Sequence, residues 1–173
     1  MKSKTKKKDN TKNNNIIISR IINAPPRKVF DVWTKPKHIK HWWGPEHFTA
    51  PIIKVDLRKG GKYLYCMQGP DGKKYWSGGK FIEVEIPKRV VVLDYFADEK
   101  GNKIDPAKVF GADIKIPKES IVTVTFDDYK GKTKLTILYS PKTLAEKKAL
   151  IKVQMVEGWN TSLDKLVVCI KNS

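Results

Sequence analysis

Several features that mark common protein classes are missing from this 173-residue chain. It has no run of about 18 consecutive apolar residues, so we expect no transmembrane helix. Its N-terminus carries lysines without an apolar segment, so we expect no secretory signal and a cytoplasmic location. The only two cysteines, Cys66 and Cys169, form no CxxC pair, and we interpret them as buried, reduced thiols rather than a disulfide.

The common catalytic signatures are absent as well. The GxSxG, Walker, GxGxxG and HExxH motifs do not occur. All three histidines, His38, His41 and His47, lie in the segment HIKHWWGPEHF, where Glu46 is the only acid. His38 and His41 would share a helix face and could form a two-histidine metal clip, but only Glu46 is at hand to complete it. We therefore expect exposed histidines, no bound metal and no cofactor.

Acidic side chains on the expected strands are the remaining candidates for proton chemistry. They are Asp56, Glu83, Glu85 and Asp94. Asp94 stands in the apolar run VVVLDYF, where an inward-facing carboxylate would have a raised pKa and could act as an acid. Strand alternation alone does not say which way it points. The more ordinary interpretation is an outward-facing acid that balances the lysine excess.

Arginine is scarce although the chain is strongly basic. The formal net charge is +17, yet only four of the 35 basic residues are arginines. Arginine makes the bidentate contacts to bases and phosphates on which specific nucleic-acid recognition depends. The charge is also spread along the chain, since residues 1–14 hold six lysines and one aspartate. We therefore expect no specific nucleic-acid partner.

Polar and apolar patterning divides the chain into a tail and one domain. Residues 1–14 are rich in Lys and Asn without apolar periodicity, which predicts a disordered tail. Residues 15–173 are enough for a single domain with its own core. The pattern predicts strands at 16–23, 50–61, 62–68, 75–86, 89–96, 119–128 and 133–140, and short helices at 24–35 and 37–43. Sequential strands joined by short turns favour an antiparallel meander, and the fold class is α+β.

The last segment, 141–172, predicts one long helix. Its apolar residues recur every three or four positions and form one continuous stripe, made of Ile151, Met155, Trp159, Leu163, Leu166 and Ile170. Gly158 within it indicates close packing or a kink. The pair Gly78-Gly79 indicates a bulge or a close backbone approach in its strand. Residues 97–118 have no clean period and are expected to form a long loop, either functional or covering a sheet edge.

Aromatic side chains suggest what lies between sheet and helix. On the strand 62–68, Tyr63, Tyr65 and Met67 share one face. If that face meets the long helix, it contacts Met155 and Trp159. The result is an aromatic-lined pocket for a small molecule, or a solid core built from the same residues.

The order of the motifs resembles a known family. APxxxVFxxWT, WWGPxxFT, DLRxGGxY, MxGPDG and GWxxSLDKL follow one another over about residues 16–170. Together they resemble the heat-shock-chaperone ATPase activator homologue family, within the START-like (Bet v-like, polyketide cyclase-like) superfamily. The resemblance implies a helix-grip fold, in which a curved antiparallel sheet of about six or seven strands grips a long C-terminal helix around a cavity. The lining residues it implies are Trp42, Trp43, Phe48, Tyr65, Met67, Trp76, Phe81, Tyr95, Met155 and Trp159.

The function implied is binding of a small hydrophobic or amphipathic molecule, such as a lipid or an aromatic metabolite, by a monomer or weak homodimer. An enzyme of the cyclase, dehydratase or hydrolase kind is the alternative, and it requires an acid such as Asp94 or Glu83, or a histidine, in the cavity. An interaction module is the third hypothesis, either a chaperone partner or an electrostatic binder of nucleic acid or anionic membrane. Chaperone activation itself is not expected, because only the 14-residue tail precedes the domain. Trp42 and Trp43 are about 100° apart on a helix, so one is expected to anchor the core while the other faces the cavity.

Overall fold

The computed structural model describes residues 13–173 and has one antiparallel sheet at its centre. The tail expected at 1–14 therefore lies outside the described residues except for its last two positions. Neighbouring strands follow the order β1-β7-β6-β5-β4-β3-β2. The strands are β1 (Ile16–Ile22), β2 (Thr49–Val55), β3 (Lys62–Gln68), β4 (Lys74–Glu85), β5 (Arg89–Ala97), β6 (Ser120–Tyr129) and β7 (Lys132–Tyr139).

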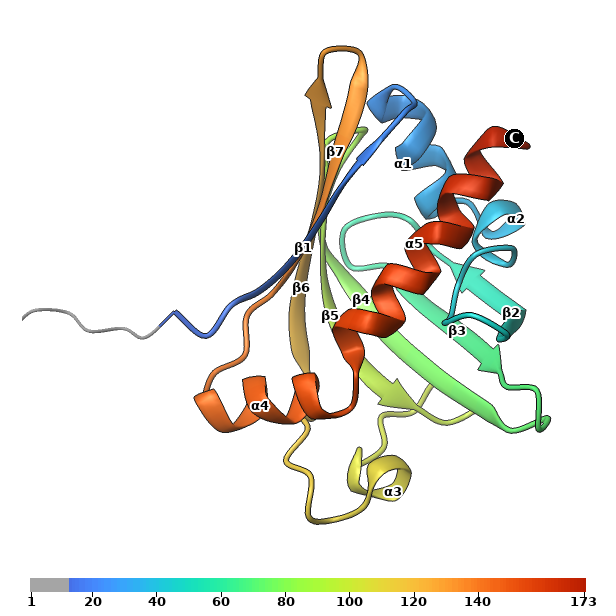
Figure 1. Cartoon of the computed structure of the whole chain (residues 1–173). Coiled ribbons are helices and arrows are strands. Elements are labelled where there is room, and N and C mark those ends of the chain that lie inside the picture. Colours follow the sequence, from blue (N-terminus) through green and yellow to red (C-terminus); the bar gives the residue numbers. More distant parts are fainter. Residues whose placement is uncertain (1–12) are drawn as a thin grey trace, which may run out of the picture.

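The sheet curves around the C-terminal helix, as Figure 1 shows. The helices are α1 (Pro26–Thr34), α2 (Pro36–Ile39), α3 (Ala107–Phe110), α4 (Leu144–Lys152) and α5 (Met155–Lys171). Strands β2 to β7 form the expected meander, and β1 pairs with β7 to complete the sheet. The predicted α+β helix-grip architecture, with seven strands and two short helices after the first, is confirmed. None of the described helices is long and apolar enough to cross a membrane.

The sequence explains why the elements begin and end here. In β7 the apolar residues alternate with polar ones, and the side chains of Leu135, Ile137 and Tyr139 are buried. Pro26 occupies the first turn of α1, where its missing N–H has no cost. Helix α1 then buries Phe30 against Phe126 of β6, with ring centroids 5.2 Å apart.

The C-terminal segment forms two helices, so the prediction of one long helix is wrong. Thr143 and Glu146 form a capping box that begins α4. Gln154 takes a left-handed backbone conformation (φ 58°) and turns the chain before α5. Ile151 is consequently 48% exposed, and the apolar stripe begins at Met155. The helical spacing of apolar residues continues across the break between the two helices, so the sequence pattern did not reveal it.

Three smaller expectations concern the second short helix, the long loop and the glycine pair. The second short helix ends at Ile39, since Lys40 to Trp42 form turns. The long loop 97–118 contains the short helix α3 and an isolated bridge between Ala97 and Lys103. Gly78-Gly79 marks a close approach of neighbouring residues, whereas the register shift in β4 lies between Phe81 and Glu83.

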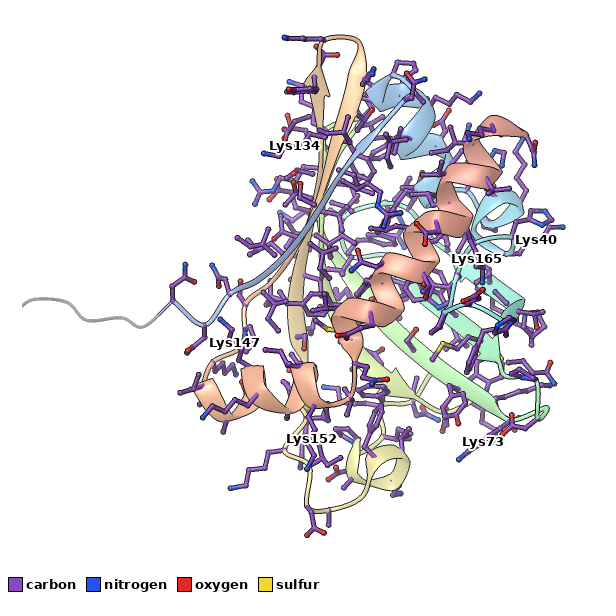
Figure 2. All side chains as sticks on the ribbon, in the orientation of Figure 1. Lys40, Lys73, Lys134, Lys147, Lys152 and Lys165 are labelled. Atoms are coloured by element: carbon purple, nitrogen blue, oxygen red, sulfur yellow. The ribbon has the colours of Figure 1, made fainter. Side chains whose placement is uncertain are left out.

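The lysines are distributed over the outside of the molecule. Those labelled in Figure 2 lie just after α2, in the β3–β4 turn, and on β7, α4 and α5, not in one patch. This distribution agrees with the spread of charge along the sequence.

Candidate functional site

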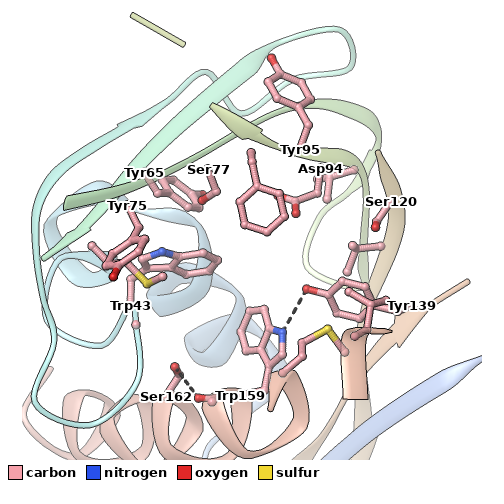
Figure 3. Close-up of a pocket in the computed structure, with 18 of the residues that line it drawn as sticks. Trp43, Tyr65, Tyr75, Ser77, Asp94, Tyr95, Ser120, Tyr139, Trp159 and Ser162 are labelled. Atoms are coloured by element: carbon pink, nitrogen blue, oxygen red, sulfur yellow. Dashed lines mark hydrogen bonds between the residues drawn. The ribbon is translucent and has the colours of Figure 1, made fainter. Parts of the chain in front are cut away.

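A cavity of about 330 Å³ lies between the concave face of the sheet and α5. Strands β3 to β7 supply most of its wall, and residues at the α4–α5 junction and on α5 face them (Figure 3). The loop after α2 contributes Trp43, Gly44 and Pro45, and the long loop contributes Phe110 and Ile116. The loop 97–118 therefore helps to close the cavity.

Aromatic rings form a connected set on this wall. Trp43 lies 4.7 Å from Tyr65 and 5.4 Å from Trp159, measured between ring centroids. Trp159 stacks on Trp33 at 5.7 Å with an interplanar angle of 11°. Tyr63 continues the set beside Tyr65 at 4.8 Å. Pairs in such geometry are stabilised beyond the area they bury, so the wall is firm as well as apolar.

Adjacent tryptophans have different roles. Trp42 is only 1% exposed, and its indole N–H donates to the Val32 carbonyl at 3.1 Å. It anchors the loop to α1 and does not line the cavity. Trp43 points into the cavity, as Figure 3 shows. One tryptophan therefore packs in the core and the other faces the cavity, as expected, and the core residue is Trp42.

A tyrosine and a carboxylate meet on the concave face. Tyr63 on β3 pairs with Gly79 on β4, and Gly79 pairs with Asp94 on β5. The three positions form a row across the sheet. A Cβ at Gly79 would lie 2.4 Å from the Tyr63 hydroxyl, so glycine leaves the space that the tyrosine occupies. The Tyr63 hydroxyl thereby donates a 2.6 Å hydrogen bond to Asp94.

Asp94 therefore points into the cavity, and the interpretation of an outward-facing acid is wrong. Figure 3 shows its carboxylate directed toward the interior. Burial raises the pKa of Asp94 to about 6, and the hydrogen bond from Tyr63 opposes that rise. The group is mostly ionised at neutral pH and takes up a proton under mildly acidic conditions.

A second polar pair joins the sheet wall to α5. The indole N–H of Trp159 donates to the Tyr139 hydroxyl at 3.0 Å. The Tyr139 hydroxyl has its own hydrogen left to donate, and it bonds to no acceptor within 13–173. Burial and the nearby Asp94 charge raise the pKa values of Tyr139 and Tyr65, so both stay neutral.

The loop at the cavity edge is held by a lysine. Nζ of Lys165 on α5 donates to the carbonyls of Gly44, Pro45 and Phe48 at 3.0, 3.3 and 3.0 Å. Burial lowers the pKa of Lys165. Because Gly44 and Pro45 belong to the cavity wall, this lysine fixes the side of the cavity that Trp43 occupies.

The residues proposed from sequence divide into three groups. Trp43, Tyr65, Met67, Phe81, Met155 and Trp159 line the cavity. Trp76 and Tyr95 belong to the wall, but they alternate with the inward-facing Ser77 and Asp94, so their rings lie on the opposite face of the sheet. Figure 3 shows the Tyr95 ring pointing away. Trp42 and Phe48 do not line the cavity, and Phe48 packs near Tyr75 and Gly69 instead.

Sequence reasoning missed several lining residues, among them Trp33, Phe96, Ser120 and Tyr139. Period-two alternation could have found Phe96, since it shares a strand face with Asp94. The contribution of Trp33 depends on how α1 packs, which no local pattern reveals.

The histidines lie apart from this cavity. His41 and His47 are exposed, and His38 is partly exposed. His38 and His41 border a separate groove between α2 and α5, together with Cys169 and Lys165. No group of three or more His, Cys, Asp or Glu side chains in the described part of the chain is arranged to hold a metal ion.

The chain is similar to known proteins in both sequence and structure. A family model described as "Activator of Hsp90 ATPase homolog 1-like protein" matches residues 23–171. The structure is similar to that of a Staphylococcus epidermidis protein (29% identity, 93% of this chain and 92% of that one, TM-score 0.73). A Mycobacterium smegmatis protein is similar at 25% identity, with 90% of each chain covered and a TM-score of 0.77. An Arthrobacter aurescens protein at 23% identity shares the fold, with 93% and 88% covered and a TM-score of 0.78. No curated protein matches the chain.

Proposed function

Because the chain belongs to the activator of Hsp90 ATPase homolog 1-like protein family, we propose that it binds a small hydrophobic or amphipathic molecule between its sheet and α5. The observation that carries the proposal is the cavity of about 330 Å³ lined by aromatic rings. Its volume falls at the lower end of the range for small-molecule sites. A lipid chain segment or an aromatic metabolite suits that size and lining.

The few polar groups support an amphipathic ligand rather than a purely apolar one. Asp94, Tyr139 and Tyr65 present polar atoms to a wall that is otherwise largely apolar. Such isolated polar groups in an apolar pocket fix the orientation of a ligand. The Tyr139 hydroxyl accepts from Trp159 and donates to no group within residues 13–173, so its hydrogen can be donated to a carbonyl or hydroxyl oxygen of a ligand.

Native mass spectrometry of the protein purified from the organism that encodes it tests this proposal. We expect a fraction of the protein to carry a noncovalent adduct of a few hundred daltons or less, released on denaturation. An identical preparation of a Ser77→Phe variant, whose added ring occupies the cavity, serves as the control and should lack the adduct. Adduct-free wild-type protein, or an adduct kept by the variant, contradicts binding in this cavity.

An acid–base enzyme is the second candidate, and Asp94 favours it. A carboxylate with a pKa near 6 that faces an aromatic-lined cavity is suited to proton transfer close to neutral pH. Incubating a metabolite extract with the wild type and with Asp94→Asn tests this candidate by mass spectrometry. A compound converted by the wild type alone supports the enzyme, and identical extracts after both incubations count against it.

A further inference from the structure

One charged side chain faces the cavity, and its sign is opposite to that of the molecule. Asp94 is the only acid in the wall, and none of the residues that form it within 13–173 is Lys, Arg or His. The whole chain nevertheless carries a formal net charge of +17. The positive charge of the surface therefore surrounds a cavity whose one charged side chain, among the described residues, is negative.

This carboxylate is incompletely satisfied. Its Oδ1 accepts the hydrogen bond from Tyr63, and Oδ2 accepts none from the described residues. Asp94 also forms no ion pair within that part of the chain, whereas Asp31, Asp56 and Asp164 each pair with a basic residue. A buried carboxylate without a cation is unfavourable. A positive group entering the cavity would remove that penalty.

The aromatic rings favour the same charge. Indole and phenol rings have negative faces that attract cations, and Trp is the strongest of them. Trp43 and Trp159 present their rings to the cavity from the side of the α2 loop and α5, and Tyr65 lines it from the same sheet wall as Asp94 (Figure 3). The indole N–H of Trp159 is engaged by Tyr139, so the ring, not its donor, is available to a ligand.

We propose that the ligand is an amine: an aromatic or amphipathic molecule whose protonated or quaternary nitrogen lies between Asp94 and the tryptophan and tyrosine rings. The proposal rests on the proposed function and names the chemical class of that ligand. An ammonium group hydrogen-bonds to the free Oδ2, and the apolar part of the molecule packs against the rest of the wall. An anionic ligand would meet Asp94 with no cation in the wall to balance it.

The positive surface does not oppose this selection inside the cavity. Exposed charges are screened over about 8 Å at physiological ionic strength. The surface lysines therefore slow the approach of a cation more than they weaken its final contacts, which are short.

Three probes that share an indole ring and differ in charge test the proposal. Tryptamine is a cation, tryptophol is neutral and indoleacetate is an anion. We expect isothermal titration calorimetry of the full chain at pH 7.5 to give tryptamine an affinity about tenfold or more above that of tryptophol, since one charged hydrogen bond and a cation–π contact separate them. Indoleacetate should bind most weakly.

Asp94→Asn should abolish the preference for tryptamine while tryptophol binding remains. Asp128→Asn is the matched control, because Asp128 is an exposed acid at the far end of β6, and it should behave as the wild type. A second measurement needs no variant. Lowering the pH to about 5 protonates Asp94 and should reduce the preference, while tryptamine, an alkylamine like lysine, stays charged. The other titratable groups that face Asp94, Tyr63 on β3, Tyr65 on β3 and Tyr139 on β7, remain neutral throughout.

The outcomes separate the two proposals. Binding of tryptophol equal to or stronger than that of tryptamine overturns the amine assignment and leaves the hydrophobic cavity intact. A preference for tryptamine that survives both Asp94→Asn and the lower pH overturns the role of Asp94. If none of the three probes binds, the proposed function itself fails for ligands of this size.

Discussion

The Tyr63 hydroxyl reaches the Asp94 carboxylate across an intervening strand, at 2.6 Å. The two residues lie on β3 and β5, and the strand between them contributes Gly79, which has no side chain to obstruct the contact. The pair places a carboxylate and its donor at the wall of an apolar cavity. This geometry depends on the absence of a Cβ at Gly79.

Gly79→Ala should therefore be strongly destabilising. The added Cβ would lie 2.4 Å from the Tyr63 ring and 2.5 Å from the Leu93 carbonyl oxygen, and the backbone atom cannot move aside. We expect a loss of about 3 kcal/mol in the free energy of unfolding, typical of overpacking a close contact. Urea denaturation measures it.

Two other glycines provide matched controls. At Gly78 the nearest atom is the edge of the Tyr95 ring at 2.9 Å, on the outer face of the sheet, so Gly78→Ala should cost less. At Gly158, a Cβ meets only the Pro45 ring at 3.7 Å, so Gly158→Ala should stabilise the helix by up to about 1 kcal/mol. Equal effects at Gly79 and Gly158 would rule out the close approach.

Asp94→Asn should stabilise the fold at neutral pH. The folded-state pKa of Asp94, about 6, exceeds the value of about 3.9 expected in an unfolded chain. The native state therefore binds more protons between these values, and wild-type stability from this group falls as pH rises through about 4 to 6, then stays level. We expect the variant to be about 1–2 kcal/mol more stable at pH 7.5 and to lose that advantage near pH 4.

Unfolding curves across this pH range, recorded for the wild type and for both Asp94→Asn and Asp128→Asn, provide the measurement. The stability difference should narrow as pH falls for Asp94→Asn only. A difference independent of pH would show that Asp94 titrates normally.

Trp42 and Trp43 should respond differently to replacement by phenylalanine. Trp42→Phe removes the hydrogen bond to Val32 and leaves a cavity in the core, at about 2–3 kcal/mol. Trp43→Phe should cost about 1 kcal/mol, because its ring borders the cavity, and it should lower the affinity for tryptophol. Urea unfolding and calorimetry of both variants provide the measurement. A larger loss of stability in Trp43→Phe than in Trp42→Phe would contradict the assignment of Trp42 to the core and Trp43 to the cavity.

Lys165→Met should loosen the loop at the cavity edge. The ammonium group donates to three backbone carbonyls of that loop, from Gly44 to Phe48. We expect a loss of about 1–3 kcal/mol and faster hydrogen exchange of the amides in residues 44–48. Lys148→Met, at an exposed position of α4, should leave both quantities unchanged. Unaltered exchange in Lys165→Met would exclude this role.

The fold was more accessible from sequence than the site. Alternation and turn residues predicted every strand of the sheet, because each strand buries one face. The break at Gln154 was missed because a left-handed residue leaves no mark on apolar spacing. The direction of Asp94 was misjudged for a related reason. It depends on its register with Gly79 and Tyr63, two residues that are distant in sequence.

The segment HIKHWWGPEHF was also only partly predictable from sequence. Its tryptophans were correctly separated into one core and one cavity side chain, although they follow α2 and do not belong to the helix that the expectation assumed. Trp42 was the core side chain because its indole N–H bonds to the Val32 carbonyl, a partner ten residues earlier in the chain. The family resemblance implied that Phe48 lines the cavity, yet its ring packs near Tyr75.

Calorimetric titration of tryptophol into the wild type and into Ser77→Phe tests the central claim most directly. Ser77 faces the cavity from β4 (Figure 3), so a phenyl ring there occupies the space proposed for the ligand. We predict one binding site in the wild type and none in a Ser77→Phe variant whose circular dichroism is unchanged. Equal binding by both proteins, or no binding by the wild type, would contradict a ligand-binding cavity between the sheet and α5.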